Sequence, residues 1–329
     1  MNRRMDSMSQ KIIGIDIGGT YVKIGVVNLF GEILKKWKIA TDRQAQGKYI
    51  VDHIWKSIEE NVTTNEIENV LGIGIGVPGF IDKNQGKIDA VNIGWINYEL
   101  KRKFEEKTHL PIIIENDANT AALGEYWHDP MISDHMMLVT LGTGVGSGII
   151  MDGNVLHGYK GLAGEIGHYV VDPDGHPCNC GRRGCLDTIA SATGVEREAM
   201  KIVQQEPNSK LAKLYASHQQ LTAKDVFQLA EAGDVHSQEI IDQLVDNLGF
   251  VLANVGTVVN PFKILIGGGL SQAGIPFVQQ IEVSFKKHSL RWISQTTQVE
   301  IAKLGNDAGI IGAAYLIKKA LGKETSTCY

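Results

Sequence analysis

An internal repeat of glycine-rich patterns constrains the fold of this chain more than any other feature. Residues 15–20 (Ile-Asp-Ile-Gly-Gly-Thr), with the apolar residues 22–27 after them, parallel residues 140–144 (Thr-Leu-Gly-Thr-Gly), with residues 145–151 after them. Both patterns predict an apolar strand, a glycine turn that carries a threonine, and a second apolar strand. Two such hairpins in two domains would face each other across a cleft and offer backbone N–H groups to an anion between them. The alternative is that glycine hairpins are common and the match is a coincidence.

Patterns typical of strands and helices alternate along the rest of the chain. Ile50, Ile54 and Ile58 recur every four residues, which predicts the apolar face of a helix. Residues 112–114 are a continuous apolar run, which is typical of a buried strand. Strands are predicted at residues 11–16, 22–27, 70–77, 112–114, 137–141, 145–151 and 263–266, and helices at residues 49–60, 99–107, 118–127, in most of 189–260 and at about 309–319. This alternation predicts an α/β fold with some antiparallel hairpins.

Charge and hydropathy argue against two classes of partner. The 329 residues include 32 Lys and Arg against 37 Asp and Glu, a net charge of −5 with no basic run, so we expect no nucleic-acid partner. No stretch approaches the roughly 18 apolar residues of a membrane-spanning helix, and residues 1–10 lack the apolar segment of a secretory signal. We therefore expect a cytoplasmic protein without a membrane partner. Glycine is unusually frequent, at 37 residues, and gathers in short runs, which indicates turns where the backbone approaches a ligand.

The first glycine turn has the residues of a phosphate site. Gly18 and Gly19 let the backbone reach phosphate oxygens, and Thr20 adds a hydroxyl donor. Lys23 adds a positive charge, and Asp16 would hold Mg²⁺ directly or through water. The alternative for Asp16 is that it caps a turn. Neither a P-loop nor a dinucleotide-binding glycine pattern occurs in the chain.

A second polar motif, residues 116–119 (Asn-Asp-Ala-Asn), follows the predicted strand 112–114. A carboxylate at the carboxyl end of a strand lies where α/β sheets bind ligands, so Asp117 would accept the proton of a substrate hydroxyl. The alternative is an N-cap, because Asn and Asp are favoured caps and a helix is predicted to begin here.

Three of the four cysteines lie close together in a segment without periodicity, residues 158–187: Cys178, Cys180 and Cys185. Cytoplasmic thiols stay reduced, so this spacing indicates a metal site rather than a disulfide framework. Three cysteines and one histidine complete a closed tetrahedral zinc site, which is structural because it has no open position for a catalytic water. His168 is favoured over His176, which is only two residues from Cys178. The alternative is three reduced cysteines without a metal.

Together these motifs resemble the ROK family of sugar kinases and repressors, within the sugar kinase, Hsp70 and actin superfamily. The resemblance spans about residues 11–317 and is greatest toward the bacterial ROK-type glucokinases, including residues 91–95. It rests on Asp16-x-Gly18-Gly19-Thr20-x-x-Lys23, Asn116-Asp117-Ala118-Asn119, Leu141-Gly142-Thr143-Gly144-x-Gly146, Glu165-x-Gly167-His168 and Cys178-x-Cys180-Gly181-x-x-Gly184-Cys185.

The resemblance implies a two-domain α/β fold of the actin-like sugar kinase ATPase type, with a cleft between the domains. The small domain would span residues 1–118, joined by the C-terminal helix at about 306–329. The large domain would span residues 119–305 and carry the zinc loop, residues 158–187. We also expect a homo-oligomer, a dimer or a tetramer, since family members often form these.

The resemblance also implies ATP-dependent phosphorylation of a hexose, with glucose first, and ATP, Mg²⁺ and structural Zn²⁺ as cofactors. Asp117 would be the catalytic base. The residues that would hold the sugar are Gly79, Asn92, Asn116, Asp117, Glu165, His168 and Asp187. Those that would bind ATP are Asp16, Gly18, Gly19, Thr20 and Lys23 in the first hairpin, Gly142, Thr143 and Gly144 in the second, and Gly267, Gly268 and Gly269 beside the adenosine. The zinc ligands would be His168, Cys178, Cys180 and Cys185.

Two positions depart from the family pattern. The family usually has glutamate two residues after the third cysteine, where it touches the sugar, and this chain has Asp187. This departure leaves open how tightly, and which, sugar binds. Ser147 stands where many relatives have glycine.

Several alternatives stay open at this point. N-acetylmannosamine or fructose would suit the same motifs, and polyphosphate would suit the same cleft as a phosphate donor. A ROK repressor would need an N-terminal helix-turn-helix, whereas only residues 1–10 precede the first predicted strand. A sugar-responsive regulator without catalysis is the remaining alternative, and the presence of Asp16, Lys23 and Asp117 argues against it.

Overall fold

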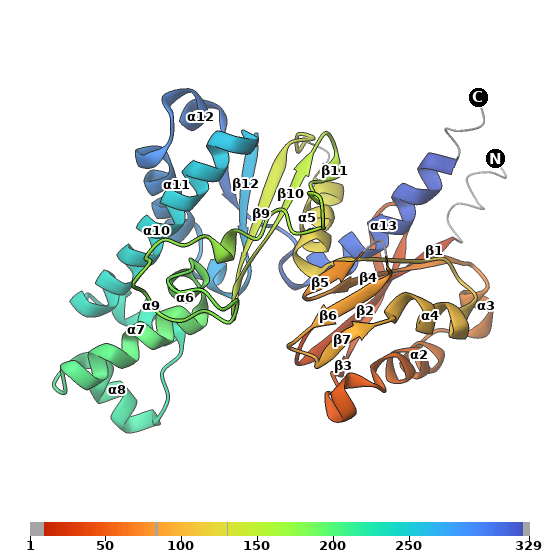
Figure 1. The fold of residues 1–329 in the computed structure, drawn as a ribbon, viewed down its shortest axis with the longest axis horizontal. Helices are drawn as coiled ribbons and strands as arrows, with labels where there is room; N and C mark the ends of the chain where they lie inside the picture. Colours follow the sequence, from red (N-terminus) through yellow and green to blue (C-terminus); the bar gives the residue numbers. More distant parts are fainter. Residues whose placement is uncertain (1–9, 83–84, 130, 325–329) are drawn as a thin grey trace.

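The computed structural model describes residues 10–82, 85–129 and 131–324. Two lobes lie side by side, each built on a five-stranded sheet, and helices α5 (Asp117–His128) and α13 (Ala308–Glu324) lie toward the junction of the lobes (Figure 1). The predictions that rest on residues 1–9 and on Cys328 fall outside the described residues.

The first sheet has the strand order β3-β2-β1-β4-β8. Strand β2 runs antiparallel to both β1 and β3, whereas β4 runs parallel to both β1 and β8. The strands are β1 (Lys11–Ile17), β2 (Tyr21–Asn28), β3 (Ile33–Ala40), β4 (Val70–Val77) and β8 (Ile112–Asn116). The strands predicted in this half of the chain are confirmed, and the first glycine turn joins β1 to β2.

The second sheet repeats this design with the order β11-β10-β9-β12-β13. Again one strand, β10, is antiparallel to both its neighbours, and another, β12, is parallel to both. The strands are β9 (Met136–Leu141), β10 (Val145–Met151), β11 (Asn154–Val155), β12 (Lys263–Gly267) and β13 (Gln298–Ile301). The hairpins β1–β2 and β9–β10 therefore hold equivalent places in two sheets, so the repeat in the sequence is not a coincidence.

The predicted helices are confirmed, with ends that shift by a few residues. The region 189–260 divides into four helices after a first short one, and the longest ends at Asn260, whose φ of 45° is left-handed, directly before Pro261. The helices other than α5 and α13 are α2 (Ile50–Asn61), α3 (Thr64–Ile67), α4 (Leu100–Thr108), α6 (Asp187–Ala190), α7 (Ala192–Gln205), α8 (Lys210–His218), α9 (Ala223–Glu231), α10 (Val235–Val259), α11 (Ile275–His288) and α12 (Arg291–Thr296). Among the described residues, no helix is long and apolar enough to cross a membrane.

Several elements carried no clear pattern in the sequence. Strand β3 lies at a sheet edge and places lysines at positions where a buried strand would need apolar residues. A third small sheet contains strands of only three or four residues: β5 (Phe80–Asp82), β6 (Lys87–Ala90) and β7 (Trp95–Tyr98). Strand β13 and helices α11 and α12 were also not predicted. The described residues also form four short 3₁₀ segments: η1 (Gln44–Gly47), η2 (Ile166–His168), η3 (Gly269–Ala273) and η4 (Gly305–Asp307).

Four glycines lie at the packing surfaces of α13 rather than beside a ligand. A Cβ added at Gly14 or Gly74, on the first sheet, would stand 2.1 or 1.7 Å from a backbone oxygen of α13. Gly312 of α13 and Gly124 of α5 bring these two helices equally close. The abundance of glycine thus reflects close backbone packing as well as turns, which corrects the expectation that it marks ligand approach alone.

Helix α13 belongs to the end of the chain but packs on its beginning. Ile310, Ala314 and Ile317 of α13 share one buried cluster with Ile12 and Val27 of the first sheet. Helix α5 follows the first sheet in the chain, and helix α13 follows the second sheet. The two helices contact each other, and both contact the first lobe. The residue limits predicted for the two domains stay predictions.

Candidate active site

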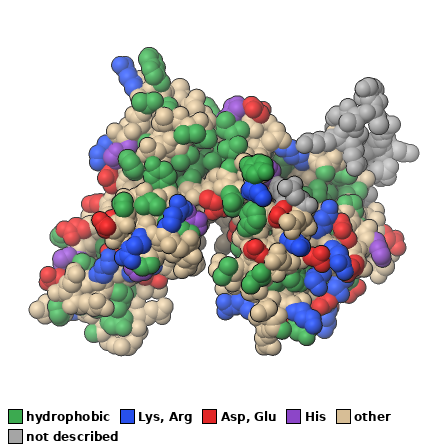
Figure 2. All heavy atoms as spheres, viewed as in Figure 1, with side chains coloured by type: hydrophobic (Ala, Val, Ile, Leu, Met, Phe, Trp, Pro, Cys, Tyr) green, Lys and Arg blue, Asp and Glu red, His purple; other side chains and the backbone are tan. Residues whose placement is uncertain are grey.

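A cavity of about 920 Å³ lies between the two lobes, where Figure 2 shows the molecule hollowed. Residues from both glycine hairpins line it, together with the first turn of α5. Most of the residues predicted for the site line this cavity: Asp16, Gly18, Gly19, Thr20, Lys23, Gly79, Asn92, Asn116, Asp117, Gly142, Thr143, Gly144, Glu165, His168, Asp187, Gly267 and Gly268. Gly269 is not part of the lining, and the three cysteines form a separate cluster with His168.

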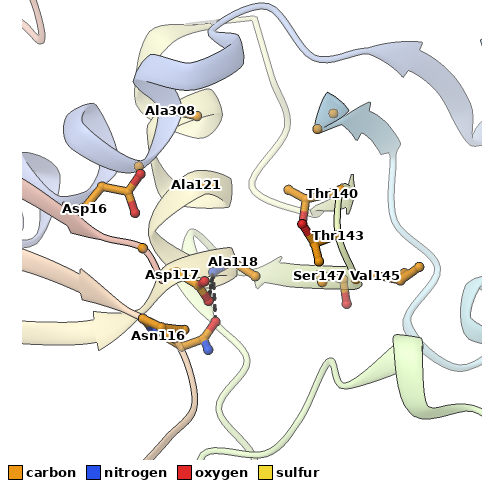
Figure 3. Close-up of a pocket in the computed structure, with 18 of the residues that line it drawn as sticks. Asp16, Asn116, Asp117, Ala118, Ala121, Thr140, Thr143, Val145, Ser147 and Ala308 are labelled. Atoms are coloured by element: carbon orange, nitrogen blue, oxygen red, sulfur yellow. Dashed lines mark hydrogen bonds between the residues drawn. The ribbon is translucent and has the colours of Figure 1, made fainter. Parts of the chain in front are cut away.

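Strand β8 ends and α5 begins at this cavity. Asn116 is the N-cap of α5, because its side-chain oxygen accepts hydrogen bonds from the N–H groups of Ala118 at 2.9 Å and Asn119 at 3.2 Å. Asp117 Oδ1 also accepts the Ala118 N–H at 2.9 Å, as Figure 3 shows. The cap that sequence reasoning offered as an alternative is thus supplied by Asn116, and the carboxylate of Asp117 remains available at the cavity.

The surroundings of Asp117 make it a stronger base than an ordinary aspartate. Burial first, and then the negative charges of Asp16 and Glu165, raise the pKa of Asp117 to about 6, although the hydrogen bond from the Ala118 N–H acts to lower it. A general base is most effective when its pKa lies near the working pH. At neutral pH, Asp117 is therefore mostly ionised yet basic enough to take a proton.

A buried carboxylate directly before the cap fixes the end of β8. Glu115 is only 4% exposed, and its Oε2 lies 2.7 Å from Nε2 of His157. Its Oε1 accepts hydrogen bonds from Asn119 Nδ2 at 3.1 Å and from the Asn116 N–H at 3.0 Å. His157 belongs to the segment after β11, so this pair connects the first sheet to the loop of the second lobe. A buried, fully hydrogen-bonded carboxylate of this kind orders the backbone around it.

The first glycine turn is both charged and held from outside. Lys23 Nζ lies 3.0 Å from Asp16 Oδ2, across the β1–β2 ladder. The Thr41 hydroxyl donates to the Gly18 carbonyl at 2.7 Å, and the Thr41 N–H donates to the Thr20 carbonyl at 2.9 Å. With these carbonyls engaged by Thr41, the turn offers the cavity a hydroxyl, glycine backbone and an ammonium group. This arrangement suits phosphate oxygens.

The second glycine turn carries no charge of its own. The Gly142 carbonyl accepts the Ala192 N–H at 2.8 Å, and the Val145 N–H donates to Asp187 Oδ1 at 2.6 Å. Figure 3 shows Thr143 and Val145 on this side of the cavity, across from Asp16. The second turn is therefore held by the segment that follows the cysteine cluster.

Residues of both lobes line the cavity around Asp117 and form two walls. On the second lobe, Glu165 and His168 line the cavity, and the Ser147 hydroxyl donates to the Gly164 carbonyl beside them. On the first lobe, Asn116 Nδ2 donates to the Gly79 carbonyl at 3.4 Å, and Asn92 lines the cavity. Carboxylate, imidazole and amide groups around a common space suit a ligand with many hydroxyls. Ser147, the mild departure from the family, thus ties strand β10 to the wall.

The four predicted metal ligands come together. One ligand atom each from His168, Cys178, Cys180 and Cys185 lies within 4.8 Å of the others. Cys178 Sγ lies 3.6 Å from His168 Nδ1, and the Sγ atoms of Cys180 and Cys185 lie 3.5 Å apart. These separations suit tetrahedral Zn²⁺, whose bonds to sulfur are about 2.3 Å and to nitrogen about 2.0 Å.

Two thiols of the cluster differ in acidity: burial and the neighbouring thiols raise the pKa of Cys185 to about 12. Burial alone would raise the pKa of Cys180, but hydrogen bonds from the backbone and side chain of Arg182 and from the neighbouring thiols lower it to about 6. The thiolate is the form that binds metals. His176 instead has Nδ1 2.8 Å from the Pro177 carbonyl and lies outside the cluster, so the choice of His168 is the one that the geometry favours.

Glycines at the carboxyl end of β12 form a further part of the cavity wall. Gly267 and Gly268 line it, and Gly268 has a φ of 83°, with a Cβ position only 2.5 Å from the Leu141 carbonyl oxygen. Nearby, a Cβ on Gly309 would stand 2.8 Å from the Asp16 carboxyl carbon. A side chain at either position would clash, at Gly268 with the backbone of Leu141 and at Gly309 with the side chain of Asp16.

Some cavity residues were missed by sequence reasoning. Arg43 lines the cavity and, with Lys23, supplies its positive charge, but no motif surrounds it. Glu125 is 1% exposed and accepts the N–H groups of Lys303 at 3.1 Å and Leu304 at 2.8 Å, which fixes the connection into α13. The buried contacts of Glu125 bridge distant parts of the chain, so no local pattern could have indicated them.

Comparisons with known proteins show the family to which this chain is related. The ROK family profile matches residues 12–320. A glucokinase of Halalkalibacterium halodurans is 46% identical over 312 residues, 93% of this chain and 94% of that protein. A xylose repressor of Caldicellulosiruptor bescii is 31% identical over 313 residues, 93% of this chain and 77% of the repressor.

A solved structure supports the same relationship. The crystal structure of a ROK family glucokinase from Streptomyces griseus, in complex with glucose and AMPPNP, matches with a TM-score of 0.78 and 34% identity, over 94% of this chain and 99% of that one. The two lobes with their repeated sheets have the actin-like sugar kinase fold that the sequence predicted. This chain belongs to the ROK family.

Proposed function

We propose that this protein is an ATP-dependent glucokinase, which converts glucose to glucose 6-phosphate. The observation that carries the proposal is Asp117, a carboxylate with its pKa raised to about 6, in a cavity that also contains two glycine turns. The resemblance to glucokinases, one of them solved with glucose and AMPPNP, supports glucose as the sugar and ATP as the donor.

In the proposed reaction, the wall around Asp117 holds the sugar. Asn92, Asn116, Glu165 and His168 bind its hydroxyls, and Gly79 leaves room beside them. Asp117 takes the proton of the attacking sugar hydroxyl while the oxygen of that hydroxyl bonds to the γ-phosphorus. The bond between that phosphorus and the β–γ bridging oxygen breaks, and ADP leaves with the electron pair. A base of this kind contributes about 10²–10⁴-fold to the rate.

The two glycine turns would hold the phosphates of ATP from opposite sides. Lys23 and Thr20 of the first turn and the backbone of the second turn supply donors, and Gly267 and Gly268 border the adenosine. Asp16, beside Lys23, would hold Mg²⁺, which neutralises phosphate charge during the transfer. Closing the two lobes on a sugar would exclude water, which otherwise attacks ATP.

The cysteine cluster would hold a structural zinc ion. Its four ligands leave no open position, so zinc would supply rigidity rather than chemistry. His168 would join the zinc to the sugar wall, because Nδ1 faces the cluster while the residue also lines the cavity. Asp187 is proposed as a further sugar contact, as the family pattern implies.

We also propose a cytoplasmic homo-oligomer. Reduced thiols and a need for ATP suit the cytoplasm. Exposed apolar side chains lie on three helices that pack together, α10, α11 and α12, and include Val258 at 84%, Val283 at 68% and Trp292 at 78% exposure. Apolar surface of this kind favours an interface between copies. Light scattering would separate a dimer from a tetramer, and a monomer would contradict this part of the proposal.

A coupled ADP-release assay tests the proposed activity. Glucose, mannose, fructose and N-acetylmannosamine are compared as acceptors, and polyphosphate replaces ATP in a parallel series that measures glucose 6-phosphate. We expect the highest kcat/KM with glucose and ATP. A higher value for another sugar would reassign the substrate, and no sugar-dependent ADP release with any of the four would contradict a sugar kinase.

A further inference from the structure

The carboxylate of Asp187 turns toward the second glycine hairpin. Its Oδ1 accepts the Val145 N–H at 2.6 Å and stands 2.7 Å from where a Cβ on Gly144 would lie. The hydrogen bond that this oxygen accepts therefore comes from the turn between β9 and β10, although Asp187 is the first residue of helix α6. Asp187 is 42 residues from Val145 in the chain, so this contact joins two separate segments.

Two more hydrogen bonds fasten the same turn to the segment that Asp187 begins. The Ala192 N–H donates to the Gly142 carbonyl at 2.8 Å. The Thr193 hydroxyl donates to the Thr143 carbonyl at 2.9 Å. The carbonyls of the turn are therefore directed toward the start of α7, away from the rest of the cavity.

The backbone N–H groups of the same turn remain available to bind a ligand. Within the described part of the chain, the N–H groups of Thr143 and Gly144 donate to no acceptor, and both residues line the cavity. Successive backbone N–H groups in a glycine turn bind anions, and they do so best when their orientation is fixed in advance. The orientation of these two donors depends on the contacts on either side of them, including that of Val145 with Asp187.

We propose that Asp187 is a positioning residue that holds the β9–β10 turn in the orientation in which it binds the phosphates of the nucleotide. This inference rests on the proposed function and deepens it, because it assigns Asp187 a nucleotide-side role in addition to the implied sugar contact. Cys185 of the metal cluster lies two residues earlier in the chain. The cluster, the sugar wall and the phosphate turn are then parts of one connected segment.

Three substitutions of Asp187 have different expected effects. Asp187→Ala removes the acceptor and leaves the Val145 N–H without a partner. Asp187→Asn keeps an oxygen at the same place and loses only the charge, so the hydrogen bond persists. Asp187→Glu adds a methylene where the carboxylate already lies against Gly144, so the longer side chain has to leave the Val145 N–H.

The first measurement is binding of AMPPNP with Mg²⁺ by calorimetry, without sugar. We expect Asp187→Ala to weaken binding about tenfold, or about 1.4 kcal/mol, and Asp187→Asn to stay within about threefold of the unmodified protein. Asp174→Asn is the matched control, since Asp174 lies in the preceding loop and does not line the cavity. The second measurement is hydrogen exchange of residues 142–146, which we expect to be faster in Asp187→Ala and unchanged in Asp187→Asn.

The outcomes separate a positioning role from a sugar contact. If Asp187→Ala raises the KM for sugar while AMPPNP affinity and hydrogen exchange stay unchanged, the inference is overturned. If Asp187→Ala does not fold, Thr193→Val takes its place, because it removes the hydrogen bond from Thr193 to the same turn; we expect it to weaken AMPPNP binding about threefold. Unchanged AMPPNP binding in both Thr193→Val and Asp187→Glu would also overturn the inference. Neither measurement contains sugar, so a failed glucokinase assay contradicts the proposed function and leaves this test standing.

Discussion

The two glycine hairpins occupy equivalent positions in the two sheets, yet different interactions hold their turns. The β1–β2 turn contains its own ion pair, Lys23 with Asp16, at 3.0 Å. The β9–β10 turn contains no charged residue and is held by three hydrogen bonds from residues 187–193. One turn thus supplies charge, and the other supplies oriented backbone.

This difference shows how a repeated structure can take on two tasks in one reaction. A charged turn can attract phosphate and a metal from a distance, whereas a neutral turn contributes only through the placement of its N–H groups. We therefore expect the first hairpin to be sensitive to changes in its own side chains. The second should be sensitive to changes in the segment that holds it.

The largest effect is expected at Asp117, which belongs to neither hairpin and lies between them. Asp117→Asn keeps the shape of the side chain but cannot take a proton, so we expect kcat to fall about 10²–10⁴-fold while sugar affinity changes little. Steady-state kinetics and sugar binding by calorimetry check this. A variant that retains more than about a tenth of the original kcat would show that another group is the base.

The raised pKa of Asp117 predicts how both activity and stability change with pH. Since the base must be ionised, kcat/KM for the sugar should rise with pH and level off above about 6. The raised pKa also means that ionisation opposes folding: stability is lost as pH rises from the ordinary aspartate pKa of 3.8 through about 6. Asp117→Asn should therefore raise the free energy of unfolding at pH 7 by about 1–3 kcal/mol, measured by denaturant unfolding at pH 4 and pH 7.

The next largest effect tests the charge of the first hairpin. Lys23→Met removes the ammonium group and leaves Asp16 unpaired, so we expect kcat/KM for ATP to fall about 10–100-fold, with a smaller change in the KM for sugar. Lys38→Met is the matched control, because Lys38 is the cross-strand neighbour of Lys23 on β3 but does not line the cavity. Equal losses in both variants would contradict a phosphate role for Lys23.

Removal of the metal tests the segment that holds the second hairpin. Elemental analysis should find one zinc per chain, and Cys180→Ser should lower its content and weaken sugar binding about tenfold, because His168 serves both sites. Hydrogen exchange over residues 158–187 should increase in the same variant. Normal sugar affinity in zinc-free protein would separate the metal from the site, and freshly purified protein without zinc would remove the metal from it altogether.

The smallest effect is expected at the contact between His157 and Glu115. His157→Gln keeps a donor near the buried carboxylate but changes its length and shape, so we expect kcat to fall about threefold with little change in the KM for ATP. His128→Gln is the control, since His128 lies at the far end of α5 and outside the cavity. A loss confined to the KM for ATP would contradict a role in placing the Asp117 loop.

Sequence reasoning predicted the parts of this molecule whose signals are local. The two glycine turns, the polar motif after β8 and the cysteine spacing each occupy a few consecutive residues, and each has a direct physical reading. The cavity unites nearly all of them, with Gly269 outside its lining. The roles of the individual residues stay predictions until they are tested.

What sequence reasoning missed depends on contacts between distant residues or on weak local patterns. The bonds of Asp187 to Val145 and of Glu115 to His157 each span 42 residues, and no spacing rule connects such positions. Strand β3 escaped prediction because an edge strand needs few apolar residues. The glycines that pack against α13 were interpreted as turn residues, because the local sequence does not indicate that a helix distant in the chain packs on them.

The position of helix α13 has a consequence for how the protein is made. Ile310, Ala314 and Ile317 complete a buried cluster with Ile12 and Val27 of the first sheet. On the ribosome, the first sheet is synthesised well before residues 308–324, which follow every strand of the second sheet in the chain. Domains usually fold as units, the N-terminal one first, during synthesis. We therefore expect the second lobe to complete its sheet while the first lobe still exposes the face that α13 covers, so that the first lobe finishes folding after the second.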